Sequence, residues 1–142
     1  MANYLAVLVA AIAAYVVGFL WYGPVFGKKW MALMGFTEKD KEKAKQKGMV
    51  KAYVATFFSM LVMAYVLGSL MGPVLTLFAA STGLGALTGA VGGAFVWLGF
   101  FATTMLGKVF WEGKSWTLYV LDAGHYLVTL VVMGAILGAW RP

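Results

Sequence analysis

Four long stretches of apolar residues divide the chain, and no other feature constrains the fold as much. Each is close to the ~20 residues that a helix needs to cross the hydrocarbon core of a bilayer. Of all residues, 63% are apolar and 11% are charged, whereas about a quarter of the residues of a soluble domain are charged. We therefore predict one all-α integral membrane domain, residues 1–142, with transmembrane helices at about residues 4–22, 49–71, 82–107 and 116–140.

Basic residues lie almost entirely on one side of this predicted domain. The loop 23–48, the start of the second span and the connection 108–114 hold ten of the eleven basic residues, and only Arg141 lies on the other side. Basic loops of membrane proteins face the cytoplasm. We therefore predict a multi-pass protein of the cytoplasmic (inner) membrane with both termini outside. This placement explains the net charge of +6 without a nucleic-acid partner. We expect membrane lipids to be the partners of the protein.

The cytoplasmic loop 23–48 is expected to contain helical segments. Gly23-Pro24 is expected to end the first span, because proline breaks a helix. Residues 25–36 suit a short helix that lies in the headgroup region with its apolar side down. Thr37 is typical of an N-cap, since acidic residues follow in the first turn and lysines accumulate toward the end. A short amphipathic and charged helical segment therefore connects the first two spans.

The second span is expected to end at Gly72-Pro73 for the same reason. The residues after it, 74–80, are apolar but too few to cross a membrane. Two interpretations stay open for this segment, an external turn and a shallow re-entrant piece.

Small residues recur at four-residue spacing in three of the spans. Such rows let helix backbones approach each other closely, and close approach supplies the attraction between helices in lipid. The third span has small residues around much of its circumference, so we expect it to be the central helix, in contact with two neighbours or with a symmetry mate. The rows are Ala6, Ala10, Ala14 and Gly18 in the first span, Gly85, Gly89 and Gly93 in the third, and Gly134 and Gly138 in the fourth.

Asp122 and His125 are the only ionisable side chains far from the ends of any apolar stretch. At ~1.5 Å per residue, Asp122 lies roughly 9 Å inside the fourth span and His125 about 13 Å inside. Their spacing of three places both on one helical face. Ionisable groups in hydrocarbon are costly, so each needs a partner, a wet cavity or a function.

Neighbouring helices are expected to bring other polar groups to the same depth. Tyr22, Thr103 and Thr104 carry hydroxyl groups that suit the carboxylate of Asp122, and Lys108 is placed to pair with it from the interface. Two interpretations of Asp122 and His125 stay open. In one, they belong to a hydrogen-bond network that fixes helix register. In the other, they bind protons or cations in a cavity, and Tyr22, Thr103 and Thr104 line that cavity.

Several kinds of chemistry lack the residues they need. Cysteine is absent, and the chain has one histidine and five acidic residues, three of them in the charged loop. This excludes thiolate chemistry and makes a metal site that needs several ligands a poor hypothesis. Ser81 has no base nearby in the sequence, so nucleophilic catalysis has no support. We predict no enzymatic activity, no metal and no cofactor.

The sequence resembles a known family at Trp21-Tyr22-Gly23-Pro24, in the stretch 99–104, at Trp111-Glu112-Gly113 and at 122–126. It is similar to small bacterial membrane proteins catalogued as "domain of unknown function seventeen sixty-one". The resemblance extends across all four spans and implies a four-span integral protein. It implies no activity and carries no catalytic residues.

The polar pair in the fourth span leads to two functional hypotheses. The first is a small transporter or channel-like protein with Asp122 and His125 as proton- or cation-binding groups, assembled as a homo-oligomer because four spans rarely enclose a path alone. The alternative is a structural, assembly or lipid-organising membrane subunit that transports nothing. The sequence identifies neither a substrate nor an oligomer number.

Overall fold

The structure of the protein, a computed structural model, describes residues 3–140, without the side chains of residues 75 and 77–80. These residues form helices and no strand, which confirms the all-α prediction. Four stretches are long and apolar enough to cross a membrane, and they confirm the four predicted spans in number. These stretches are Tyr4–Val25, Val50–Val74, Gly85–Phe110 and Trp116–Ala139. The elements are α1 (Tyr4–Leu20), η1 (Trp21–Val25), α2 (Gly27–Met34), α3 (Glu38–Lys47), α4 (Val50–Thr82), α5 (Gly85–Val96), η2 (Trp97–Ala102), α6 (Gly107–Phe110) and α7 (Trp116–Ala139).

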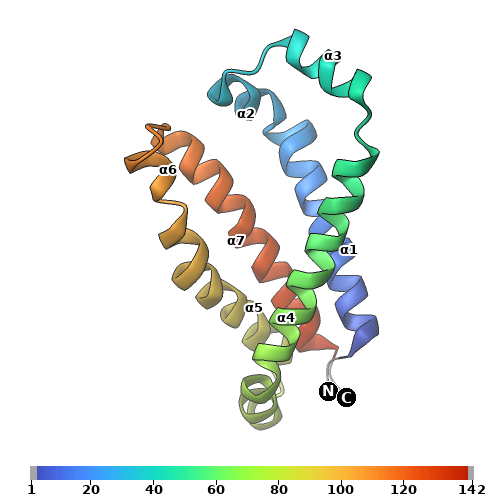
Figure 1. Cartoon of the computed structure of the whole chain (residues 1–142). Coiled ribbons are helices and arrows are strands. Elements are labelled where there is room, and N and C mark those ends of the chain that lie inside the picture. Colours follow the sequence, from blue (N-terminus) through green and yellow to red (C-terminus); the bar gives the residue numbers. More distant parts are fainter. Residues whose placement is uncertain (1–2, 141–142) are drawn as a thin grey trace.

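The two ends of the bundle differ in character. Helices α2, α3 and α6 lie together at one end, which we call the lysine-bearing end (Figure 1). At the opposite end, which we call the terminal end, the side-chain amide of Asn3 donates to the carbonyl oxygen of Trp140 at 3.1 Å. The first and last described residues therefore lie on the same side, as four crossings require. That the lysine-bearing end faces the cytoplasm stays a prediction.

Helix α7 is the central helix of the bundle. Eleven of its 24 residues are buried, whereas Gly89 and Gly93 are the buried residues of α5. Helix α7 packs against both α1 and α5. The expectation that the third span is the central helix was therefore wrong, although α5 does contact two neighbours, α7 and α4. Gly89 and Gly93 face α7 and Gly92 faces Met71 of α4, whereas another face carries large exposed side chains such as Leu87, Val91 and Phe95.

The glycine rows bring the backbones of α5 and α7 into direct contact. A Cβ atom on Gly89 would overlap the carbonyl oxygen of Gly134, and one on Gly138 would overlap that of Gly85. On Gly93, a Cβ atom would overlap the carbonyl oxygen of Leu130. These positions have no room for any side chain. The predicted role of small residues in close helix approach is confirmed at this crossing.

The alanine row of α1 lies in the hydrophobic core. Ala6, Ala10 and Ala14 are at most 1% exposed and belong to one cluster with Leu67 of α4 and Met133 of α7. One turn further on, a Cβ atom on Gly18 would lie 3.2 Å from Nε2 of His125. The row that packs α1 against the core therefore leads directly to the polar residues of α7.

The two prolines differ in their effect. Pro24 lies inside the π-helical turn η1, and the chain leaves the helix two residues later, at Phe26. Pro73 lies inside α4, which continues to Thr82, so residues 74–80 are helical and do not form an irregular turn. That this helical segment is re-entrant stays a prediction. A proline removes one backbone donor, but unwinding a helix in apolar surroundings would leave several polar groups unpaired. Continuing the helix past a proline therefore costs less free energy than unwinding it.

The connection between the first two spans has the predicted capping groups. Thr37 and Asp40 form a reciprocal capping box at the start of α3, and Gly48 follows its last residue with a positive φ of 81°. Helix α2 ends at Gly35, also left-handed with a φ of 74°. Every residue of α3 is exposed, so this helix depends on its caps and charges rather than on packing.

Candidate functional site

Two π-helical turns hold the polar part of α7 from opposite sides, and each begins with a tryptophan. The indole Nε1 of Trp21 in η1 donates to the carbonyl oxygen of Leu121 at 3.1 Å, and that of Trp97 in η2 donates to Ala123 at 2.7 Å. These two carbonyls flank Asp122. Turns of this kind are rare and occur often at functional sites. They fix the position of Asp122 relative to both neighbouring helices.

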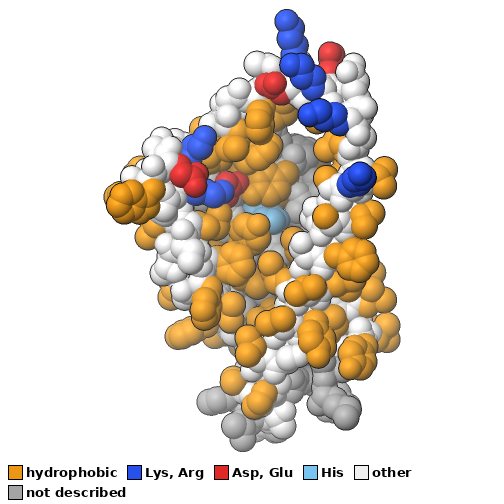
Figure 2. Space-filling view, viewed as in Figure 1, with side chains coloured by type: hydrophobic (Ala, Val, Ile, Leu, Met, Phe, Trp, Pro, Cys, Tyr) orange, Lys and Arg blue, Asp and Glu red, His pale blue; other side chains and the backbone are white. Residues whose placement is uncertain are grey.

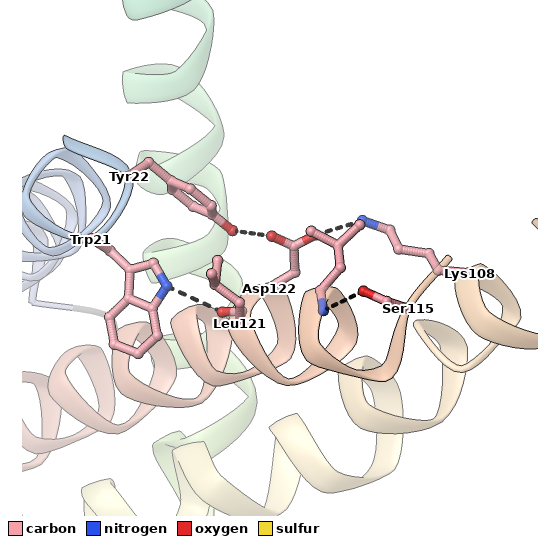
Figure 3. A network of polar contacts seen from close by, with 7 residues as sticks. Trp21, Tyr22, Lys108, Ser115, Leu121 and Asp122 are labelled. Atoms are coloured by element: carbon pink, nitrogen blue, oxygen red, sulfur yellow. Dashed lines mark hydrogen bonds and ion pairs between the residues drawn. The ribbon is translucent and has the colours of Figure 1, made fainter. Parts of the chain in front are cut away.

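The carboxylate of Asp122 has a partner for each oxygen. Its Oδ1 accepts a hydrogen bond from the hydroxyl of Tyr22 at 2.8 Å, and its Oδ2 lies 3.1 Å from Nζ of Lys108. Asp122 is 5% exposed. Figure 3 shows the three side chains converging from η1, α6 and α7. The buried negative charge is therefore compensated by one ammonium group and one hydroxyl.

Lys108 reaches Asp122 from the lysine-bearing end of the bundle. Its side chain keeps 39% of its surface exposed, against 7% for the side chain of Asp122. The turn that carries it is fixed on two sides: the hydroxyl of Tyr119 donates to Ala102 at 2.8 Å, and Ser115 caps α7 by accepting from the N–H of Leu118 at 3.1 Å. The ammonium thus has water on one side and a buried carboxylate on the other.

The imidazole of His125 lies one turn deeper than Asp122. It is 4% exposed, and its Nε2 lies 3.3 Å from the hydroxyl of Thr129. Its Nδ1 is the one buried side-chain polar atom without a hydrogen-bond partner among the described residues. In Figure 2 this single histidine, in pale blue, lies at the floor of a recess between α7 and α4. The site therefore contains one buried ring nitrogen that no described group contacts by a hydrogen bond.

Aromatic rings surround this imidazole. The ring centroids of Tyr22 and Tyr126 each lie 4.9 Å from that of His125, and that of Trp21 lies at 6.1 Å. The absence of a Cβ atom on Gly18 provides the space for the imidazole edge. The imidazole therefore lies in a largely aromatic environment.

The structure brings some of the predicted site residues together and leaves others apart. Tyr22 contacts Asp122 directly, and Lys108 pairs with it as expected. Thr103 and Thr104 do not join them: both residues are exposed, and their hydroxyls donate to carbonyls of their own helix, those of Gly99 and Phe100. That any of these residues binds an ion stays a prediction.

Sequence reasoning missed the part that the tryptophans play. A tryptophan at the end of a span is usually read as an interface anchor, and one inside a span as a filler of volume, yet Trp21 and Trp97 both donate to carbonyls beside Asp122. A recurring pattern was available in the sequence. Phe19-Leu20-Trp21-Tyr22-Gly23 and Phe95-Val96-Trp97-Leu98-Gly99 both have an aromatic residue two positions before a tryptophan and a glycine two positions after it.

The arrangement suits proton binding better than metal binding. Among residues 3–140, no group of three or more His, Asp or Glu side chains is placed to hold a metal ion. The one buried carboxylate already has a cation, Lys108, beside it. A metal ion needs several ligands, whereas a proton needs a single ring nitrogen. Besides the charge pair, the site offers one such nitrogen, Nδ1 of His125, which is buried a helical turn away and has no hydrogen-bond partner in the described part of the chain.

Comparison with known proteins adds a family and no activity. A family model described as "Protein of unknown function (DUF1761)" matches residues 5–138. No curated protein matches the chain, and no solved structure matches it.

Proposed function

We propose, for a chain that belongs to the DUF1761 family of proteins of unknown function, that it is a small transporter or channel which moves protons or small cations across the cytoplasmic membrane. The observation that carries this proposal is the imidazole of His125, 4% exposed and with an unpartnered ring nitrogen, one helical turn from a buried ion pair. Ionisable groups at such depth are rare and usually mark ion pathways.

The orientation that we propose places the lysine-bearing end in the cytoplasm, with both termini outside. The support is the charge distribution: ten of the eleven basic residues belong to the connections at that end or to the helix turns beside them, and such loops are retained on the cytoplasmic side. Asp122 and Lys108 then lie near the cytoplasmic boundary, and ions would enter the site from the cell interior.

A homo-oligomer is part of the proposal. Helix α5 buries only Gly89 and Gly93 within one chain, and four helices rarely enclose a path alone. Native mass spectrometry of the purified protein measures the oligomer number. We propose no enzymatic activity and no resident cofactor, because the chain lacks cysteine and has a single histidine.

Flux measurements in liposomes test the transport function. The wild-type protein is reconstituted with a pH-sensitive dye inside, and a potential or a pH gradient is imposed. We expect flux above that of empty liposomes, and we expect His125→Asn and Asp122→Asn to reduce it by about tenfold or more, as the loss of a positioned proton carrier does.

Thr103→Val is the matched control for these variants. It removes a hydroxyl from the same end of the bundle, but one that bonds only within its own helix at 2.8 Å, so the flux is expected to stay at the wild-type level. Folded His125→Asn and Asp122→Asn proteins with wild-type flux would exclude the proposed site. A folded wild-type protein without any flux would exclude transport.

A non-transporting structural role is the second candidate, and one observation favours it. The partners of Asp122 come from two separate elements, Tyr22 in η1 and Lys108 in α6, so the network joins the first span, the third span and α7. A network of this kind fixes helix register without moving any ion. Under this alternative, Asp122→Asn lowers the stability of the protein and no flux exists to be lost.

A further inference from the structure

We infer that the ion handled by this site is a proton bound at Nδ1 of His125, and that the protonated imidazole displaces Lys108 from Asp122. The inference rests on the proposed function for its biological meaning, and it adds the identity of the ion and the partner exchange that binding sets off.

The surroundings of Asp122 argue against a metal cation. Oδ1 already accepts from Tyr22, and Oδ2 already pairs with Lys108. A hard cation such as Na⁺ or Mg²⁺ needs several oxygen ligands, and residues 3–140 offer no cluster of acidic side chains here. A metal ion would have to replace the ammonium of Lys108 and would find one carboxylate. The resident lysine therefore occupies the place that a cation would take.

His125 has what a proton requires. In the tautomer whose hydrogen is on Nε2, Nε2 donates to the hydroxyl of Thr129, 3.3 Å away, and Nδ1 carries a lone pair that has no hydrogen-bond partner among the described residues. We take this tautomer for the inference. Asp122 lies three residues earlier on the same helical face, where side chains come within contact of each other. The imidazole can therefore reach the carboxylate by a change of side-chain rotamer, without any movement of the α7 backbone.

The charged and titratable groups around the imidazole are few. Asp122 and Tyr126 face it from α7, Tyr22 from η1, and Lys108 lies beyond Asp122 on α6. From α1, Gly18 approaches it, and α1 carries no charged residue. Asp122 is the sole negative partner among these described groups, so two cations compete for one carboxylate when His125 is charged.

The exchange balances in charge and costs one hydrogen bond. A proton from water forms an N–H bond at Nδ1, and the imidazole becomes a cation. The rotamer change gives up the contact between Nε2 and the hydroxyl of Thr129. The ion pair between Nζ of Lys108 and Oδ2 of Asp122 breaks and is replaced by one between the imidazolium and the carboxylate. The Lys108 side chain, already 39% exposed, moves its ammonium fully into water, where its charge is solvated. The hydrogen bond from Tyr22 to Oδ1 is retained. Helix α6 is then no longer tied to α7 by Lys108.

Stability measurements in detergent test the exchange without any transport assay. Lys108→Met is introduced into the wild-type chain and into a His125→Asn chain, and thermal midpoints are measured at about pH 8 and about pH 5.5, on either side of the ordinary histidine range. In the wild-type chain, we expect Lys108→Met to lower the midpoint at pH 8 and to lower it by less than about half as much at pH 5.5. In the His125→Asn chain, the decrease is expected to be the same at both pH values.

An equal decrease at both pH values in the wild-type chain would overturn the exchange. Should Lys108→Met fail to fold, ¹⁵N spectra of the unaltered protein decide, because its single histidine gives unambiguous imidazole signals. Protonation of both ring nitrogens at pH 5.5 supports the inference, and an imidazole that stays neutral overturns it. Flux of Na⁺ or K⁺ without proton flux would also overturn it while leaving transport intact. A pH-dependent exchange without flux would leave the exchange standing and exclude transport.

Discussion

The two halves of α7 are held to their neighbours in opposite ways. Toward the terminal end, Gly134 and Gly138 lie against the backbone of α5, with no side chain between the two helices. Toward the lysine-bearing end, α7 is held by side chains that reach across: the indoles of Trp21 and Trp97 and the ion pair of Asp122. The two halves also differ in spacing, since α4 and α7 lie close near the terminal end and far apart at the other (Figure 1).

The difference between the two halves of α7 shows two ways in which helices can associate in lipid. In lipid, helices gain little from burying apolar side chains, so they associate by close backbone approach or by polar contacts. Close approach gives a rigid, dry crossing with no room for water or ions. Polar contacts by long side chains hold the helices further apart and can exchange partners. The terminal half of α7 therefore supplies stability, and the lysine-bearing half is the part able to change state.

The largest expected effect is at the glycine crossing. Gly89→Ala adds a Cβ atom that overlaps the carbonyl oxygen of Gly134, so α5 and α7 must move apart. We expect a loss of about 3 kcal/mol of unfolding free energy, the upper end for overpacked interiors, measured by denaturant titration in mixed micelles. Gly99→Ala is the control: a Cβ atom there meets nothing within 4 Å, and alanine favours helix over glycine. Equal stability of the two variants would contradict the backbone contact.

The next largest effect concerns the ion pair, and it is expected to be asymmetric. Lys108→Met leaves the carboxylate of Asp122 buried without a counter-charge, whereas Asp122→Asn leaves an ammonium that is already 39% exposed and can return to water. Near neutral pH, we expect losses of about 2 kcal/mol for Lys108→Met and about 1 kcal/mol for Asp122→Asn, below the cost of breaking a fully buried pair. The same mixed-micelle titration measures both.

The double variant is the check on this asymmetry. With both charges removed, no group is left uncompensated, so Lys108→Met/Asp122→Asn should be more stable than Lys108→Met alone. Additive losses would mean that the two side chains do not interact, and would also remove the basis of the partner exchange.

Much of the terminal half could be predicted from the sequence. Small residues at four-residue spacing directly indicate which helix faces approach, and the glycines of α5 and α7 meet as the rows suggested. The number of spans and the side that carries the lysines can be predicted from hydropathy and charge alone. The rows do not reveal which helix has neighbours on two sides. The spacing gives one face of a contact, and the position of α7 between α1 and α5 depends on the whole assembly.

The polar half was predicted only in part, and the reason lies in η2. The contacts of Asp122 with Tyr22 and Lys108 could be predicted from depth in the membrane. Thr103 and Thr104 were expected beside them because of their depth alone, which does not tell which helix face they occupy. The π-helical turn Trp97–Ala102 precedes both threonines, and one extra residue in a turn rotates the remainder of the helix by ~100°. Hydrophobic periodicity gives no warning of such a turn, so the sequence could not give the face on which the threonines lie.

The smallest expected effect lies in α3, outside both halves of α7, and it tests whether the two halves are independent of the charged connection. Asp40 accepts from the backbone N–H and the hydroxyl of Thr37 at 2.8 and 2.9 Å, and these hydrogen bonds hold the pKa of Asp40 below its ordinary value. A lowered pKa means that the charged carboxylate stabilises the folded cap at neutral pH. This contribution is lost as the pH falls through and below the ordinary carboxyl range.

We therefore expect the first turn of α3 to fray when the pH is lowered from about 6 to about 2.5, across the ordinary titration of an aspartate. Cα chemical shifts of residues 38–41 measure the fraying. Thr37→Ala, which lacks the hydroxyl of the cap, should show reduced helicity already at pH 6. Because α3 is exposed throughout and no core residue belongs to it, Thr37→Ala should leave the thermal midpoint of the bundle unchanged. A lowered midpoint would mean that the connection at the lysine-bearing end helps to hold the spans together. The stability of the bundle would then depend on α3 as well as on the contacts along α7.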